Sequence, residues 1–238
     1  MKNRSKFNLK LSNRLQEIEQ MVTTQYNHIW DCCCDHGLLG CALLARQANE
    51  NILNNIHFVD IVPEIMAQLD NKLHRFYSNL AWETHCQDVT KLPLAKYDGN
   101  QLIIIAGIGG DLMIKFIESI YKQHKSLNID FLLCPVHHQY ALRQKLIELN
   151  FSLKKEVLIE DNQRFYEIIL VSTTSDKKSK INPIGDKIWQ TESEKQTGIA
   201  EKYLSKTLKH YQRIQQGSHQ SKTNDVQHII DAYKAITL

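Results

Sequence analysis

Acidic side chains stand directly after short apolar runs at three places in the first ninety residues. Asp31 and Asp60 each end such a run, and Asp88 comes shortly after a third. A fourth and more apolar run, residues 101–106, stops at the small-residue segment 107–110. A carboxylate at the end of a strand can accept hydrogen bonds from ribose hydroxyls or from an adenine amino group. Glycines at such a place let a ligand approach the backbone.

These acids have two readings. An acid after a strand is often only the N-cap of the next helix. Four such features at four successive strand ends favour a cofactor site, and the chain has no phosphate loop that contains a lysine. S-adenosylmethionine carries a ribose, an adenine and a sulfonium cation but no phosphate. The pattern therefore predicts S-adenosylmethionine as the cofactor.

The elements that must position these residues alternate along the chain. Short apolar runs interspersed with helical patterns predict a mostly parallel sheet with helices on both faces, an α/β fold. Two longer strands, 151–161 and 164–172, meet at Asn162-Gln163, and this hairpin would add one antiparallel strand at the end of the sheet. That combination is typical of the Rossmann-like methyltransferase fold. The other predicted strands are 28–31, 56–60, 82–86, 101–106 and 131–134.

The composition changes after residue 171, which divides the chain into two predicted parts. Residues 1–171 would form the Rossmann-like cofactor-binding domain, with a short basic N-terminal helix. A polar connector, 172–180, is followed by apolar stripes at helical spacing over 199–214 and 226–236. Two amphipathic helices joined by a polar turn predict a C-terminal helical hairpin over residues 172–238.

Composition excludes some classes of protein. The chain has 238 residues, of which 42% are hydrophobic and 23% are charged. No apolar run reaches the roughly 20 residues that a membrane helix needs, so we expect no membrane partner. The six cysteines, three of them consecutive, suit a reduced cytoplasmic protein better than a disulfide framework. Because the chain has no CxxC pair, we also expect no bound metal.

The net charge of +3 is a balance between unlike regions. The first 16 residues carry five basic residues and no acid, and residues 172–238 carry 11 basic and seven acidic residues, so a charge of about −6 falls on residues 17–171. An acidic body suits a cationic cofactor, and basic ends suit an anionic partner such as RNA. Solvated, lysine-rich termini would give the same numbers.

Longer motifs resemble the bacterial tRNA adenine-22 N1-methyltransferase family (TrmK type), a group of class I S-adenosylmethionine-dependent methyltransferases. They cover the catalytic domain in order and spacing, and the helical tail also fits. The matching segments are LSNRLQEI from Leu11, DCCCDHGLL from Asp31, AGIGGDLMIKFI from Ala106, CPVHHQYALRQKL from Cys134 and EDNQRFYEIILV from Glu160.

The resemblance implies a set of functional residues. Asp35 matches an acid of the family that lies close to the transferred methyl group, which makes it the candidate catalytic residue. A tRNA substrate and methylation of adenine N1 are implied as well. The implied cofactor-binding residues are Asp31, Cys33, His36, Asp60, Ile61, Gln87, Asp88, Ala106, Gly107, Ile108, Gly109 and Gly110.

The chain departs from the family at two places. Cys33 stands where the family usually has glycine, and Cys134-Pro135-Val136 replaces a Gln-Pro-Asn segment. Loss of both amides removes hydrogen-bonding groups expected near the target base. A small-molecule methyltransferase, or a non-catalytic RNA-binding protein that kept the fold, therefore stay open as alternatives.

Cations at both ends of the chain are candidates for binding RNA phosphates. Those in the tail recur at three- or four-residue spacing on one helical face, where a merely solvated face would look the same. The candidate RNA-binding residues are Lys6, Lys10, Arg14, Lys202, Lys206, Lys209 and Arg213.

Overall fold

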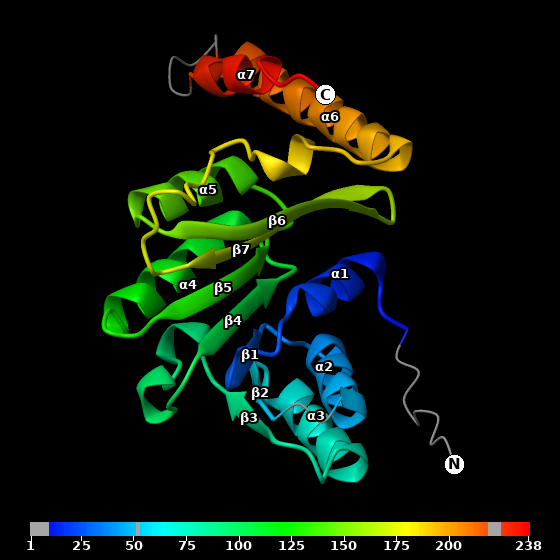
Figure 1. The fold of residues 1–238 in the computed structure, drawn as a ribbon, viewed down its shortest axis with the longest axis vertical. Coiled ribbons are helices and arrows are strands. Elements are labelled where there is room, and N and C mark those ends of the chain that lie inside the picture. The colour runs from blue at the N-terminus through cyan, green and yellow to red at the C-terminus, as the bar shows by residue number, and fades with distance from the viewer. Residues whose placement is uncertain (1–9, 51–52, 219–224) are drawn as a thin grey trace.

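Seven strands form one twisted sheet (Figure 1). The computed structural model describes residues 10–50, 53–218 and 225–238. The strand order is β3-β2-β1-β4-β5-β7-β6, and β1 to β5 are parallel to one another. This is the Rossmann-like methyltransferase arrangement that the sequence predicts. The strands are β1 (His28–Cys32), β2 (Asn55–Asp60), β3 (Trp82–Cys86), β4 (Gln101–Ala106), β5 (Ile129–Cys134), β6 (Ser152–Asp161) and β7 (Arg164–Ser172).

The terminal hairpin joins the sheet through its second strand. β7 pairs antiparallel with both β5 and β6, so β6 is the outermost strand. The antiparallel strand was expected at the end of the sheet, and it lies one position further in. The burial of the two strands explains the order: seven consecutive residues of β7 from Tyr166 are buried, whereas β6 mixes buried residues with half-buried and exposed ones.

Helices cover both faces of the sheet (Figure 1). Local signals start several of them: the Ser12 hydroxyl accepts the backbone N–H of Leu15 at 3.4 Å, and Pro63 is the first residue of α3. On one face lie α1 (Asn13–Met21), α2 (Leu38–Glu50) and α3 (Pro63–Phe76), and on the other lie α4 (Gly110–Gln123) and α5 (Gln139–Glu148).

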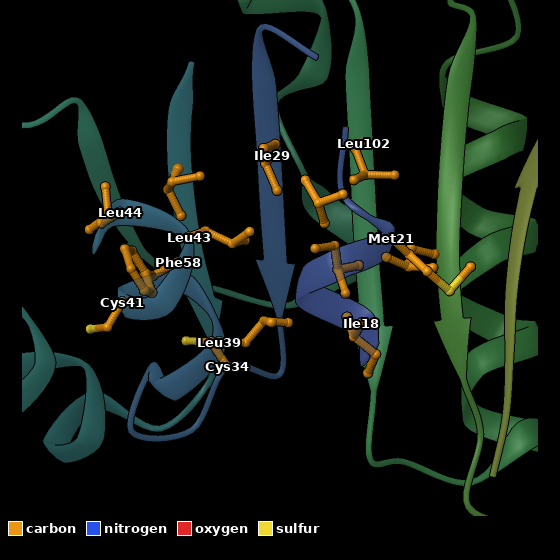
Figure 2. Close-up of a cluster of buried hydrophobic side chains, with 14 of the residues drawn as sticks. Ile18, Met21, Ile29, Cys34, Leu39, Cys41, Leu43, Leu44, Phe58 and Leu102 are labelled. Atoms are coloured by element: carbon orange, nitrogen blue, oxygen red, sulfur yellow. The ribbon is translucent and has the colours of Figure 1, made fainter. Parts of the chain in front are cut away.

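Each face of the sheet has its own apolar core. On the α1–α3 side, Ile18 and Met21 of α1 pack near Leu102 of β4, and α2 packs against Phe58 (Figure 2). On the other side, α4 and α5 pack against alternate residues of the same strands, such as Ile103 and Ile105. The alternation of side chains along each strand divides them between the two cores.

The tail forms a helical hairpin beyond β6 (Figure 1). α6 (Glu194–Ser218) and α7 (Gln227–Lys234) run in opposite directions, because Gln215 contacts Val226 and Tyr211 stacks on Tyr233. A short 3₁₀ helix, η3 (Lys187–Trp189), packs with them against Leu158 of β6. Among the described helices, none is long and apolar enough to cross a membrane.

Candidate active site

The strand order reverses between β1 and β4, and the predicted site residues lie at the carboxyl ends of β1 to β4. Ligands of open α/β sheets bind at such a switch point. Asp31 is the penultimate residue of β1 rather than its end, because pairing with both neighbours continues to Cys32. Asp31 is 5% exposed, and its carboxylate accepts the backbone N–H of Gly40 at 2.9 Å. Burial raises the pKa of Asp31 to about 7, and the nearby Asp60 adds to the shift. A cationic ligand would favour its ionised form.

The loop after β1 turns sharply. Cys33, Asp35 and Gly37 all have left-handed backbone conformations, with φ of 57°, 50° and 65°. Gly37 suits this conformation best, and a Cβ there would also lie 2.6 Å from Leu69 Cδ1, so that this side chain would have to move. At Cys33 a non-glycine residue in this conformation costs roughly 1 kcal/mol. Its half-buried side chain packs against the core on the α4–α5 side.

Asp35 and His36 form the exposed tip of this loop. Their side chains are 69% and 64% exposed, and Asp35 Oδ1 lies 3.6 Å from His36 Nε2. The backbone N–H of Asp35 donates to Asp60 Oδ2 at 3.1 Å, which pins the tip to the end of β2. The candidate catalytic carboxylate is thus held by its backbone and is free at its side chain to meet a substrate.

The end of β2 combines an acid with exposed apolar side chains. Asp60 Oδ1 also accepts the backbone N–H of Val62 at 3.2 Å. Ile61 is 64% exposed and Val62 is 38% exposed. A carboxylate beside two exposed aliphatic groups fits an adenosine, whose ribose is polar and whose base has an apolar face. The end of β2 therefore offers groups that suit the adenosine part of S-adenosylmethionine.

The end of β3 lies next to the end of β2, because the backbone N–H of Gln87 donates to the Asp60 carbonyl at 3.0 Å. Asp88 caps the short helix η1 (Val89–Lys91) and accepts the backbone N–H of Thr90 at 2.7 Å. Hydrogen bonds from Thr90 lower the pKa of Asp88. Asp88 is therefore an N-cap, one of the two interpretations of these acids, and it also lies where it was predicted to bind adenine.

Two of the three glycines after β4 make room for protein groups. A Cβ at Gly107 would lie 3.5 Å from Arg14 Nη1, and one at Gly109 would lie 2.4 Å from the His137 ring. At Gly110 a Cβ would lie 2.8 Å from the His138 carbonyl oxygen. Close packing of the β5–α5 loop thus accounts for Gly109 and Gly110, whereas at Gly107 the left-handed backbone conformation, with φ of 84°, favours glycine. Ala106 and Ile108 flank Gly107, and the Ile108 carbonyl accepts a hydrogen bond from the Val136 N–H.

Arg14 lies at the centre of this region rather than on an outer surface. Its guanidinium carbon is 5.0 Å from the centre of the Tyr166 ring, a cation–π distance. It also opposes the effect of burial on the Cys134 thiol, whose pKa burial raises to about 12. Of the other N-terminal candidates, Lys10 is exposed just before α1, and Lys6 lies outside the described residues.

A cavity of about 500 Å³ adjoins the glycine segment, between the β5–α5 loop, the start of β7 and α6. It was not predicted, since its walls come from segments far apart in the sequence. The available signal was one basic residue followed by two aromatic residues, Arg164-Phe165-Tyr166, at the start of β7. Its basic and aromatic lining residues include His137, Tyr140, Arg164, Phe165, Tyr166, Lys206, His210, Tyr211 and Arg213. A larger space of about 800 Å³ between α1 and α6 has both acidic and basic walls.

The tail cations lie on the face of α6 that approaches β6 and β7. Lys206 lies over the Phe165 ring at 5.4 Å, and Lys202 Nζ is 3.9 Å from Glu160 Oε2. Arg213 Nε donates to the Lys209 carbonyl at 3.1 Å. Lys206 and Arg213 line the cavity, and the other two continue the basic surface along the helix.

Solved structures share this fold at low sequence identity. M. capricolum TrmK in complex with S-adenosyl-homocysteine has a TM-score of 0.69 and 16% identity, over 94% of this chain and 96% of that one. The B. subtilis M1A22 tRNA methyltransferase TrmK gives 0.65 and 17%, over 95% of each chain. Streptococcus pneumoniae Sp1610, a putative tRNA (m1A22) methyltransferase, gives 0.69 and 16%, over 94% and 98%.

The sequence comparisons indicate a methyltransferase domain without indicating its substrate. No curated protein matches the sequence. A profile described as a methyltransferase domain matches residues 11–169, which include every strand from β1 to β6 and most of β7. The chain therefore belongs to this methyltransferase-domain family, for which S-adenosylmethionine is the implied cofactor.

Proposed function

We propose that the protein transfers a methyl group from S-adenosylmethionine to N1 of an adenine in tRNA. The observation that carries the proposal is the basic and aromatic cavity beside the acidic strand ends. Bases turned out of an RNA stack bind between aromatic side chains, and basic residues bind the flanking phosphates. The cavity offers both kinds of group. The solved structures of similar fold, described as tRNA methyltransferases, support the same substrate.

The opposite charges of the two neighbouring sites suit the two reactants. Bound S-adenosylmethionine supplies a methyl group already activated on a cationic sulfur. Asp31, Asp35 and Asp60 place carboxylates at this edge of the sheet, and they attract and orient a cation. The cations Arg164, Lys206 and Arg213 in the cavity repel such a ligand and attract RNA. Each reactant is thereby directed to its own side.

The chemistry demands positioning more than proton transfer. Adenine N1 has a lone pair, so it attacks the methyl carbon in line as the sulfur–carbon bond breaks, and no proton has to leave first. Holding the two reactants in line at contact distance lowers the barrier. The exposed carboxylate of Asp35 can accept a hydrogen bond from the adenine amino group and can stabilise the positive charge that develops on the ring.

The replaced Gln-Pro-Asn segment alters which groups can recognise the base. Cys134 is fully buried, and its carbonyl accepts the Gly107 N–H at 3.1 Å. Val136 contributes an aliphatic side chain to the cavity wall. Polar recognition of the base in this chain therefore falls to neighbours such as His137 and Arg164, which line the same cavity.

The test is incubation with labelled cofactor and unmodified bulk tRNA, followed by nucleoside analysis. We expect labelled 1-methyladenosine. Asp35→Ala should lower the turnover rate by about 100-fold, equivalent to about 2.7 kcal/mol, while cofactor affinity stays within a few-fold. Asp70→Ala on α3, away from these strand ends, is the matched control and should keep the wild-type rate. Normal turnover by Asp35→Ala would remove the catalytic assignment, and label in another nucleoside would correct the target atom.

A salt titration tests the role of the tail. If Lys206 and Arg213 each contact a phosphate, tRNA affinity falls steeply with salt, and each alanine variant reduces the slope of log K against log salt by about 1. Lys234→Ala on α7 is the control, with an unchanged slope. An affinity that does not depend on salt would show that the tail does not bind phosphates.

A further inference from the structure

Three histidine side chains from neighbouring strands form a row in the β1–β3 half of the sheet. His28 Nδ1 lies 3.0 Å from His57 Nε2, and His57 Nδ1 lies 3.0 Å from His85 Nε2. The register places His57 beside Trp30 and Glu83, so the histidines contact one another diagonally. Trp30 stacks on the His57 ring at 3.9 Å and an interplanar angle of 11°. The row lies on the face of the sheet opposite α2 and α3.

The contacts of His28 favour the tautomer of His57 that carries its proton on Nε2. His28 also interacts with the backbone carbonyl of Asp98, and a carbonyl only accepts, so His28 donates there. Neutral His28 then accepts at Nδ1, and His57 donates to it from Nε2. His57 Nδ1 is left with its lone pair directed at His85 and Glu83.

A carboxylate completes the group and is itself held in place. Glu83 Oε1 lies 4.0 Å from His57 Nδ1, and the potential ligand atoms of His57, Glu83 and His85 all lie within 4.8 Å of one another. The Tyr97 hydroxyl donates to Glu83 Oε2 at 2.6 Å, and Asn55 Nδ2 donates to Oε1 at 2.8 Å. His28, Tyr97 and Asn55 thus orient the three groups in the way that outer-sphere partners orient metal ligands.

We propose that His57, Glu83 and His85 bind one divalent transition-metal ion, with zinc as the best match. Two nitrogens and a carboxylate oxygen are a set that zinc accepts, with water in the fourth position. Ligands of a tetrahedral zinc ion are about 3.3 Å apart, so the observed separations of 3.0 Å and 4.0 Å require only small shifts. Glu83 is 41% exposed on the edge strand β3, which gives an ion a way in from solvent.

The site lies apart from the strand ends and does not depend on the proposed methyl transfer. Cys and His spacing along the chain predicts no metal, because the ligands come from two strands and meet only in the sheet. The ion would tie β2 to β3 one residue before Cys86, after which the chain continues to Gln87 and Asp88. A metal here would therefore steady the segment that follows β3.

The experiment measures zinc binding by the full chain after dialysis and metal analysis. We expect one zinc ion per chain, with His85→Ala and Glu83→Gln each weakening binding at least ten-fold. Zinc should raise the melting temperature of the wild-type protein, because binding to the folded state alone stabilises it. Magnesium, which prefers oxygen ligands, should not. Both substituted residues are at least partly exposed, so the variants should fold, and circular dichroism without metal checks this.

Controls separate this site from the cysteines. Cys86→Ser next to it and His74→Ala on α3 should leave zinc affinity unchanged. Cobalt bound in place of zinc should show visible absorption without the near-ultraviolet thiolate band, since the ligands are nitrogen and oxygen. Failure of the wild-type chain to bind zinc, or full binding by folded His85→Ala, would overturn the proposal. Neither result bears on methyl transfer, which is assayed separately.

Discussion

Polar side chains are buried in both halves of the sheet, as charges in one half and as neutral rings in the other. Arg143 of α5 makes ion pairs of 2.7 Å with Glu156 of β6 and Glu167 of β7, and all three side chains are 0% exposed. In the β1–β3 half, His57 is equally buried but neutral, and its partner Glu83 is 41% exposed. Buried charges must remain paired, whereas a neutral imidazole keeps a lone pair for a ligand.

The buried ionic cluster and the buried histidine row have different partners in the structure. The Tyr203 hydroxyl of α6 donates to Glu167 Oε1 at 2.5 Å, and the backbone N–H groups of Asp186 and Lys187 donate to Glu156 Oε1 at 2.7 Å and 2.6 Å. The ionic cluster therefore fastens the tail to the sheet, and one of its partners, Tyr203, lines the cavity. The histidine row contacts Tyr97 in the segment before β4, makes no hydrogen bond or ring contact with the described residues of the tail, and reaches solvent at the edge strand through the partly exposed Glu83.

Removing the cation of the ionic cluster should have the largest effect. Arg143→Met leaves Glu156 and Glu167 buried without a partner, and we expect it to lower the free energy of unfolding by about 3–5 kcal/mol. Urea denaturation measures the loss, and limited proteolysis should show earlier cleavage of the tail. Glu83→Gln, the matched change in the other half, should cost less than about 1 kcal/mol, because the group is partly hydrated.

Neutralising the whole ionic cluster separates the cost of an unpaired buried charge from the cost of altered side-chain packing. In Arg143→Met/Glu156→Gln/Glu167→Gln no charge remains buried, and we expect most of the lost stability to return. If the single variant costs less than about 1 kcal/mol, the ionic cluster does not hold the tail.

The pH dependence of stability should reveal two opposing groups in the β1–β2 half. Burial raises the pKa of Asp31 from 3.8 to about 7, so its contribution is full below about pH 4 and disappears as the pH rises towards 7. Burial lowers the pKa of His57 from 6.5 to about 3, so its contribution is full above about pH 6.5 and is lost as the pH falls towards 3. Between about pH 4.5 and 6 the two nearly cancel, since each titrating proton contributes about 1.4 kcal/mol per pH unit.

Asp31→Asn removes the contribution of Asp31 to the pH dependence of stability and leaves that of His57. Without cofactor, the variant should lose up to about 1.4 kcal/mol of stability per pH unit, relative to wild type, as the pH falls from 6 to 4.5. Urea denaturation at several pH values measures the slope. Parallel curves for the variant and the wild type would mean that Asp31 titrates normally.

The smallest effects concern two left-handed residues, one in each half. Cys33 has φ of 57° in the β1 loop, and Gln163 has φ of 62° in the β6–β7 turn. Replacing either with glycine should stabilise the protein by roughly 0.5–1 kcal/mol in thermal denaturation, because the strained conformation costs glycine nothing. Only Cys33→Gly should tighten cofactor binding, measured by calorimetry. Equal cofactor affinities in the two variants would place the Cys33 side chain away from the ligand.

Hydrophobic periodicity was enough to predict most of the fold. Runs such as 101–106 and 164–172 are strands at the predicted positions, and Pro63 begins its helix as predicted. The position of β7 between β5 and β6 was not predicted, although its apolar run 168–171 suits a strand that is buried on both faces. The hairpin turn alone does not say which of its strands joins the sheet.

The candidate site was predictable only where topology alone brings residues together. Parallel strands put the ends near Asp31, Asp60 and Asp88 on one edge, and this follows from strand order. Arg14 beside Gly107 depends on how α1 packs across the sheet, which no local pattern gives. The cavity and the histidine row likewise depend on contacts across the register and between the two ends of the chain.

The edge of the sheet at β6 is shielded by the chain that follows β7. The Leu153 N–H donates to the Ser179 carbonyl at 2.7 Å, and the Leu158 carbonyl accepts from Gln196 Nε2 at 2.9 Å. Unpaired strand edges are templates on which a second chain can add its own strand. Loss of the segment after Ser172 would expose a ten-residue edge. The tail thereby protects the folded protein against self-association, in addition to any contact with a substrate.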